Sequence, residues 1–119
     1  MALLQATYRD AGTVTVLDLS GRITLGEGSA LLRSTIRELL EQQRFKILVN
    51  LGDINYIDSS GIGELVSAYT TVKNRGGELK LLHVTKKVHD LLQITKLYTV
   101  FEVHSDEMAA LHSFDKAPA

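Results

Sequence analysis

Residues 56–65 read Tyr-Ile-Asp-Ser-Ser-Gly-Ile-Gly-Glu-Leu, and the hydrophobic periodicity of the chain changes there. Upstream, apolar residues alternate along 45–51, which predicts a strand that is buried on one or both faces. Downstream, the apolar residues recur at helical spacing: Ile62, Leu65, Val66, Tyr69 and Val72. The stretch therefore leads from a strand, through a short loop, into a helix whose apolar stripe belongs to the core.

The chain before this stretch predicts a hairpin and then a helix. Residues 3–9 and 13–20 read as strands joined by a turn that contains Gly12. The apolar phase of the second strand slips after Val16, which indicates a bulge or burial on both faces. The segment Thr24-Leu25-Gly26-Glu27 has the spacing of a capping box. An amphipathic helix is predicted behind it from Leu32, Ile36, Leu39 and Leu40.

The chain after the stretch continues this alternation. Gly76 or Gly77 is expected to end the second helix in the left-handed conformation. Thr85 and Ser105 are placed to cap two shorter helices. Two more strands are predicted, over 78–84 and 99–103.

These elements together define a fold class. Strand-helix-strand alternation implies parallel strands with right-handed crossovers, whereas the opening hairpin is antiparallel. We predict an α/β fold: a single domain over 1–114, with a mixed sheet of four to five strands packed against about four helices. Residues 115–119 are expected to form a flexible tail.

Composition excludes several classes of function. The 119 residues carry a net charge of −1, which does not suggest a nucleic-acid or membrane partner. The absence of cysteine excludes disulfides and thiolate chemistry, and the four histidines lack metal-site spacing, so no metal or cofactor is predicted. The N-terminus does not resemble a signal peptide, and no apolar run approaches the roughly 20 residues of a membrane span. A cytoplasmic protein is expected.

The two serines allow four interpretations. Ser59 or Ser60 could cap the following helix, with Gly61 and Gly63 making the turn. A catalytic serine is disfavoured because the stretch is not G-x-S-x-G and no base is evident apart from His83 at the end of a neighbouring strand. A phosphate cradle lacks the lysine of a nucleotide-binding loop, and the charge of Asp58 opposes it.

The fourth interpretation is that another protein phosphorylates Ser59. A serine at a strand-to-helix turn is exposed on a rigid scaffold, and Gly61 and Gly63 keep the surface around it low. Phosphorylation adds about −1.5 to −2 charges, which the helix amides stabilise without refolding. Beside Asp58 this charge would expel a partner docked through apolar or acidic contacts.

Residues 51–63, from Leu51 to Gly63, resemble the signature of STAS domains (sulphate transporter and anti-sigma factor antagonist). The Asp-Ser-Ser-Gly-Ile-Gly core at 58–63 is similar to that of the bacterial anti-sigma factor antagonists. Three flanking segments also resemble the family, at 19–24, 74–79 and 88–103. The resemblance implies a mixed sheet packed against helices.

The resemblance also implies a partner-switching function without enzymatic activity. In such antagonists the serine after the aspartate is phosphorylated by a serine kinase that is itself the anti-sigma factor, and here that residue is Ser59. The unphosphorylated protein binds the kinase and frees the sigma factor, and a PP2C-type phosphatase resets the switch. Asp58 would orient the serine or contact the kinase, and Ser60 would cap the helix. Three residues are expected in the docking surface: Gly61, Ile62 and Gly63.

One position departs from the family pattern. Many antagonists have an acid after the strand end at 19–23, near the serine, where this chain has Thr24, with Arg22 two residues earlier. We expect Thr24 to cap the first long helix, and its position also makes it a candidate partner contact. The alternative function is a STAS interaction module of another signalling complex, or a transporter accessory subunit, without a phosphoserine switch.

Overall fold

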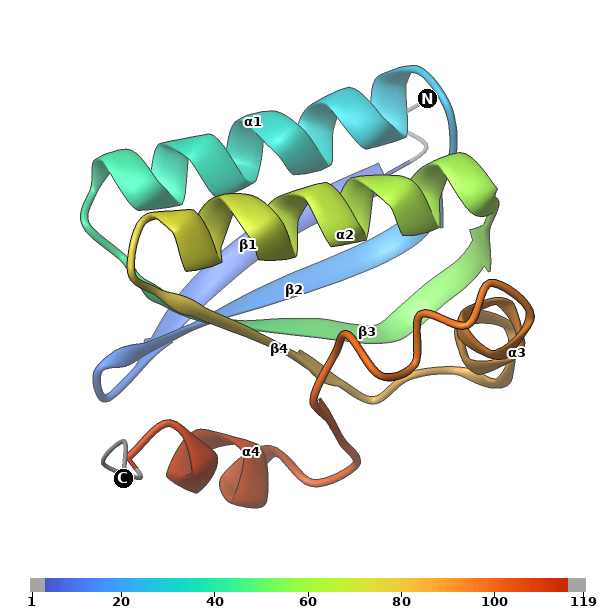
Figure 1. Cartoon of the computed structure of the whole chain (residues 1–119). Helices are drawn as coiled ribbons and strands as arrows, with labels where there is room; N and C mark the ends of the chain where they lie inside the picture. The colour runs from blue at the N-terminus through green and yellow to red at the C-terminus, as the bar shows by residue number, and fades with distance from the viewer. Residues whose placement is uncertain (1–3, 116–119) are drawn as a thin grey trace.

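The hairpin at the start of the chain opens a five-stranded sheet in the computed structural model, which describes residues 4–115 (Figure 1). The strand order follows the sequence from β1 to β5. β1 pairs antiparallel with β2, and every other neighbouring pair is parallel, as predicted for a mixed sheet. The strands are β1 (Leu4–Ala11), β2 (Val14–Ile23), β3 (Lys46–Ile57), β4 (Glu78–Leu82) and β5 (Val103–His104).

Four helices cover the sheet unequally. Two long helices lie side by side over one face, and a short C-terminal helix lies on the opposite side (Figure 1). The remaining helix follows β4 at the right-hand end of the sheet in Figure 1. The helices are α1 (Glu27–Glu41), α2 (Ser59–Asn74), α3 (Lys86–Ile94) and α4 (Glu107–Ser113).

Two apolar clusters, one on each face, explain the phase slip in β2. Leu17 and Leu19 face α1 and α2 in the larger cluster, whereas Val14 and Val16 belong to a smaller cluster with Ala110 of α4. β2 is therefore buried on both faces, and its register with β3 also shifts between Asp18 and Ser20. The stripe of α2 is core as predicted, because Leu65 and Val72 are fully buried.

The strand before the serine motif is longer than predicted. β3 does not end in a loop after Leu51 but continues to Ile57, because its second half keeps pairing with β2 through Ser20–Asp53 and Ile23–Ile57. The last strand is shorter than predicted, since only Val103–His104 pairs with β4. Phe101, predicted in that strand, lies in a turn and packs edge-on against Tyr69.

Helix ends agree only in part with the caps read from sequence. Thr85 caps α3, and Gly76 takes the left-handed conformation (φ 82°), as predicted. Thr24 does not cap α1, because the N-cap position is Gly26 and no side chain binds there. Ser105 does not cap α4 either, since the adjacent Asp106 accepts the amide of Ala109.

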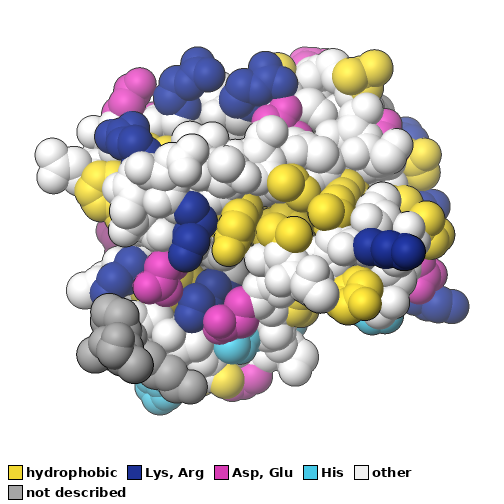
Figure 2. Space-filling model, in the orientation of Figure 1, with side chains coloured by type: hydrophobic (Ala, Val, Ile, Leu, Met, Phe, Trp, Pro, Cys, Tyr) yellow, Lys and Arg dark blue, Asp and Glu magenta, His cyan; other side chains and the backbone are white. Residues whose placement is uncertain are grey.

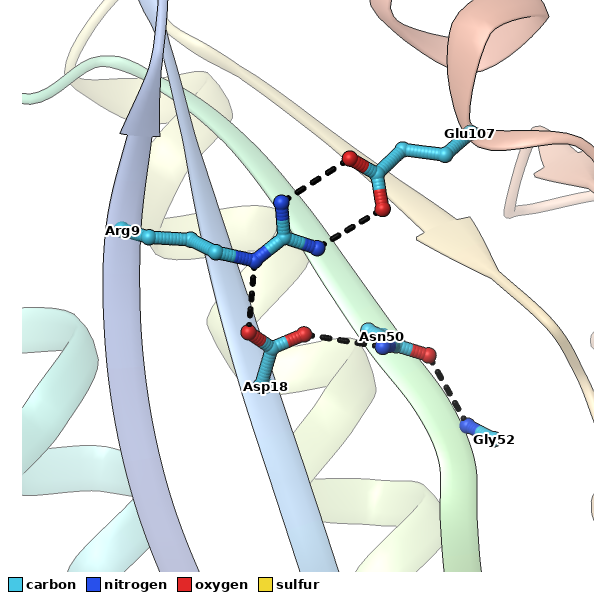
Figure 3. Close-up of polar contacts among 5 residues, drawn as sticks. All are labelled: Arg9, Asp18, Asn50, Gly52 and Glu107. Atoms are coloured by element: carbon cyan, nitrogen blue, oxygen red, sulfur yellow. Dashed lines mark hydrogen bonds and ion pairs between the residues drawn. The ribbon is translucent and has the colours of Figure 1, made fainter.

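An ion-pair network fastens α4 to the first strands (Figure 3). The Arg9 guanidinium of β1 donates to both carboxylate oxygens of Glu107, at 2.9 and 2.7 Å, and to Asp18 of β2 at 2.9 Å. Asn50 of β3 donates to the other oxygen of Asp18. Partial burial raises the pKa of Asp18, but the hydrogen bonds from Arg9 and Asn50 outweigh it, so that the pKa lies below its ordinary value. The Arg9 hydrogen bonds likewise lower the pKa of Glu107.

Removing Arg9 tests this network. We expect Arg9→Gln to lower the free energy of unfolding at pH 7 by about 1 kcal/mol, because the partners are partly exposed. The folded-state pKa values of Asp18 and Glu107 are lowered, so their contribution is present above the ordinary values of 3.8 and 4.5 and lost as pH falls through the folded values. Thermal unfolding between pH 7 and pH 3 should therefore show the gap between wild type and variant closing in acid. Arg37→Gln, on the exposed surface of α1, is the matched control, and an equal effect there would contradict the assignment.

The predicted tail over 115–119 lies outside the described residues except for Asp115.

Candidate functional site

The serine motif lies where the C-terminal ends of β2 and β3 meet the starts of α1 and α2. β2 and β3 are parallel, so both strands end at the same edge of the sheet, at the right in Figure 1. Ile23 pairs with Ile57 at the last position of each strand. The loop from Thr24 to Gly26 and the start of α2 are thereby brought side by side.

Asp58 joins these two segments. Its backbone is extended (φ −107°, ψ −178°), and its Oδ1 accepts a 2.8 Å hydrogen bond from the amide of Gly61, which makes it the N-cap of α2. Its Oδ2 accepts a longer bond, 3.4 Å, from the amide of Leu25. The Asp58 amide in turn donates to the carbonyl of Ile23. One aspartate thus caps α2 and holds the β2–α1 loop against it.

The serines have no part in this cap. Ser59 and Ser60 are exposed at the first two positions of α2. The expectation that a serine would cap the helix is wrong, because the preceding Asp58 already fills that position. A helix can use one cap residue, and the serines already have helical backbone.

Gly61 is required by the close approach of α2 to β2. A Cβ atom on Gly61 would lie 2.2 Å from the carbonyl oxygen of Ile23 and 2.7 Å from Cγ1 of Ile57. Gly61 and the adjacent Ile62, which is 1% exposed, are therefore buried. This corrects the expectation that both would lie in a docking surface: they position that surface from beneath. Gly63 is exposed, and a Cβ there would meet no atom within 4 Å.

Thr24, which was predicted as a partner contact after β2, is half-buried, and its neighbour Leu25 is more exposed. The carbonyl of Thr24 accepts hydrogen bonds from the amide and the hydroxyl of Ser29, which fixes the loop. Leu25 is 78% exposed, the highest exposure among the large hydrophobic residues of the described chain. In the sequence, Leu25 falls within the capping-box spacing of 24–27, which does not predict its exposure; an apolar residue at a helix start is the only local signal.

The chemistry that Ser59 could perform on its own is limited. His83 packs beside Gly52 of β3. Gly52 lies five residues before Ile57, which is about 16 Å along the strand, so His83 lies far along β3 from Ser59. Across residues 4–115, no group of three or more histidine and acidic side chains could hold a metal ion. Over the same residues, no helix is both long enough and apolar enough to cross a membrane. What the geometry offers is an exposed hydroxyl on a rigid helix start.

Comparison with known proteins places the chain in a family. The model of the STAS domain matches residues 5–110, so the chain belongs to the STAS domain family. The anti-sigma F factor antagonist of Paenibacillus polymyxa is 27% identical over 99 residues, which is 82% of this chain and 84% of that protein. The anti-sigma-B factor antagonist of Bacillus subtilis is 33% identical over 64 residues, covering 54% and 59%. The resemblance to anti-sigma factor antagonists is thereby confirmed.

Solved structures agree on the fold. A putative anti-sigma factor antagonist from Thermotoga maritima has a TM-score of 0.84 at 22% identity, covering 93% of this chain and 95% of that one. The phosphorylated form of the Bacillus cell fate determinant SpoIIAA has a TM-score of 0.71 at 18% identity, covering 92% and 98%. The predicted STAS fold, a five-stranded mixed sheet with four helices, is confirmed.

Replacing Asp58 by alanine or by asparagine distinguishes the role of its side-chain oxygen in the cap from the role of its charge. We expect Asp58→Ala to lower the free energy of unfolding by about 1 kcal/mol, because the amide of Gly61 loses its acceptor. Asp58→Asn keeps an oxygen in that place and should cost only a few tenths of a kcal/mol. Ser60→Ala is the matched control and should change little. Urea unfolding measures all three, and equal losses for Ala and Asn would contradict the capping role.

The two glycines of α2 should respond in opposite ways to alanine. Gly61→Ala forces the start of α2 away from the carbonyl of Ile23, which should cost about 2 kcal/mol or more. Gly63→Ala has open space at a helical position and should gain up to about 1 kcal/mol. Thermal and urea unfolding of both variants provide the measurement. A Gly61→Ala protein as stable as wild type would rule out the close approach.

Proposed function

We propose that this chain is an anti-sigma factor antagonist that switches partners through phosphorylation of Ser59. The observation that carries the proposal is an exposed serine at the first position of α2, directly after a capping aspartate that leaves its hydroxyl free of that role. The curated relatives support it, because the matching proteins of Paenibacillus polymyxa and Bacillus subtilis are named anti-sigma factor antagonists.

The proposed partner is an anti-sigma factor with serine-kinase activity. It docks over Ser59 and Ser60, where Gly63 keeps the surface low and the loop at Thr24 forms the border. Binding of the kinase by the unphosphorylated chain releases a sigma factor. A PP2C-type phosphatase removes the phosphate and restores binding. The chain itself acts by binding, in the cytoplasm, without a cofactor.

The physical basis of the switch is a change of charge at a fixed backbone. A phosphate brings about −1.5 to −2 charges to the positive end of α2, where a negative charge does not destabilise the helix. The docked partner, in contrast, meets a new dianion beside Asp58. Unphosphorylated and phosphorylated SpoIIAA both share the fold of this chain, with TM-scores of 0.69 and 0.71, so phosphorylation of that protein leaves its fold in place.

Capture of partners with Ser59 variants tests the proposal. Wild type, Ser59→Ala and Ser59→Asp serve as baits in lysate of the native host, and mass spectrometry identifies the captured proteins. We expect Ser59→Ala to retain a protein with serine-kinase sequence and Ser59→Asp to lose it by tenfold or more. The purified kinase should then transfer phosphate from ATP to wild type but not to Ser59→Ala.

Ser67→Ala is the matched control, because it removes an exposed hydroxyl from the same helix, about two turns beyond the proposed docking surface. It should bind and be phosphorylated like wild type. If Ser59→Ala and Ser59→Asp capture the same partners equally, the switch is refuted. The chain would then be a STAS interaction module of another complex or of a transporter.

A further inference from the structure

The edge that carries Ser59 also carries a group of basic side chains without acidic partners. Among the other arginines, Arg9, Arg33 and Arg44 each form an ion pair with a carboxylate, whereas Arg37 and Arg75 form none with the described residues. Arg22 and Lys87 are exposed and form no ion pair with any carboxylate of residues 4–115. An unpaired cation is therefore not particular to this edge, and what distinguishes it within residues 4–115 is that two such cations share one aromatic ring.

Both cations lie against one aromatic ring. The guanidinium carbon of Arg22 is 4.8 Å from the centroid of the Tyr56 ring, and Nζ of Lys87 is 4.6 Å from it. Tyr56 precedes Asp58 by two residues and pairs with Arg22 across β2 and β3. The ring holds two positive charges close together without neutralising either, and keeps them near the start of α2.

The position of Lys87 is unfavourable for its own helix. Lys86 and Lys87 occupy the first turn of α3, which contains no acidic residue. Positive charges at the N-terminal end of a helix oppose its dipole, whereas at the C-terminal end they would complement it. The contact of Lys87 with the Tyr56 ring offsets part of this cost but leaves the charge itself unneutralised, and a local rule broken in this way is typical of a functional surface. The charges are therefore available to a partner.

Within the part of the chain that the structure describes, the nearby carboxylates do not form ion pairs with Arg22 or Lys87. Asp58 accepts two backbone amides, from Gly61 and Leu25. Oδ1 of Asp90 lies 3.8 Å from Nδ1 of His89, the preceding residue of α3. Glu27 is at the first turn of α1, where its charge complements the helix dipole. None of them forms an ion pair with Arg22 or Lys87 in the described chain.

An exposed apolar residue completes the surface. Leu25, with 78% of its surface exposed, is tied to Asp58 through its amide and so borders the serine. Figure 2 shows apolar, basic and acidic side chains interspersed at the end of the molecule where α3 lies. We call Arg22, Leu25, Tyr56 and Lys87 the basic rim. An apolar anchor beside unpaired cations suits a protein surface of the opposite charge with an apolar pocket.

We infer that the basic rim docks an acidic protein surface, and that the kinase partner of this chain presents acidic side chains around an apolar pocket for Leu25. The inference rests on the proposed function and adds the chemistry of the partner. It also explains the direction of the switch, because phosphate at Ser59 repels an acidic surface. Nucleic acid is disfavoured as the occupant, since a net charge of −1 and two rim cations neutralise few phosphates. An anionic membrane would take a cluster of about four to eight basic residues.

A peptide probe tests the rim without the natural partner. Hexaglutamate is titrated into the ¹⁵N-labelled chain at low salt, and amide shifts give both location and affinity. We expect the shifts to concentrate on the basic rim and the start of α2. The double variant Arg22→Glu with Lys87→Glu should weaken binding about fivefold or more, as expected for the loss of two surface ion pairs. Arg22→Lys keeps the charge and should retain most of the affinity.

Lys73→Glu is the matched control for charge. Lys73 is exposed in the last turn of α2, about 21 Å along the helix from Ser59, and so beyond the screening length of salt. It should change the affinity less than twofold. Circular dichroism melting verifies that each variant is folded. Duplex DNA and phosphatidylglycerol vesicles are titrated in parallel, and stronger binding of either would overturn the assignment of an acidic protein.

Adding Ser59→Asp separates this inference from the proposed function. If the charge reversal weakens hexaglutamate binding but Ser59→Asp does not, the acidic docking surface stands and the charge switch fails. If shifts spread evenly over all basic positions, or Lys73→Glu matters as much as the rim, the docking surface is refuted even where a kinase is captured. A captured kinase should likewise bind the double variant Arg22→Glu with Lys87→Glu more weakly, and bind Lys73→Glu as it binds wild type.

Discussion

The contact between the backbone of Gly61 and the carbonyl of Ile23 determines the arrangement of the whole site. No side chain fits there, since a Cβ would come within 2.2 Å of the carbonyl oxygen, so the start of α2 lies directly on the end of β2. This closeness brings the Asp58 carboxylate within reach of the amide of Leu25, 33 residues earlier in the chain. The loop after β2, the cap of α2 and the exposed serine are consequently one rigid unit.

Because Asp58 caps α2, the helix start does not depend on the serine that the proposed switch would modify. Had Ser59 been the N-cap, its oxygen would accept a backbone amide, and phosphorylation would remove a bond that the helix needs. Because the aspartate makes that bond, the helix start keeps its cap whatever happens to the neighbouring hydroxyl. The serine keeps helical backbone geometry and an exposed side chain. Stability and modification can therefore change independently, which a reversible switch requires.

Local patterns were sufficient for the elements whose causes are local. The stripe of α2, the Thr85 cap and the left-handed Gly76 follow from spacing and residue type alone. The second half of β3 was missed because its Gly-Asp and Asn residues read as a loop, while pairing with β2, a long-range effect, keeps them extended. Asp58, rather than the predicted Ser59 or Ser60, caps α2 because the same pairing keeps β3 extended as far as Ile57. The convergence of Arg22 and Lys87 on Tyr56 joins three elements and has no local signal.

The sheet separates the site from the rest of the molecule. α4 is held on the opposite face by the ion pair of Arg9 with Glu107 and by its own apolar cluster (Figure 3). Salt screens exposed charges beyond about 8 Å at physiological ionic strength, so a phosphate on Ser59 acts on little beyond its own edge. Within that range lie the start of α2, which tolerates the charge, and whatever is docked on the edge. In the proposed switch, a phosphate on Ser59 would therefore act by changing which protein binds at this edge.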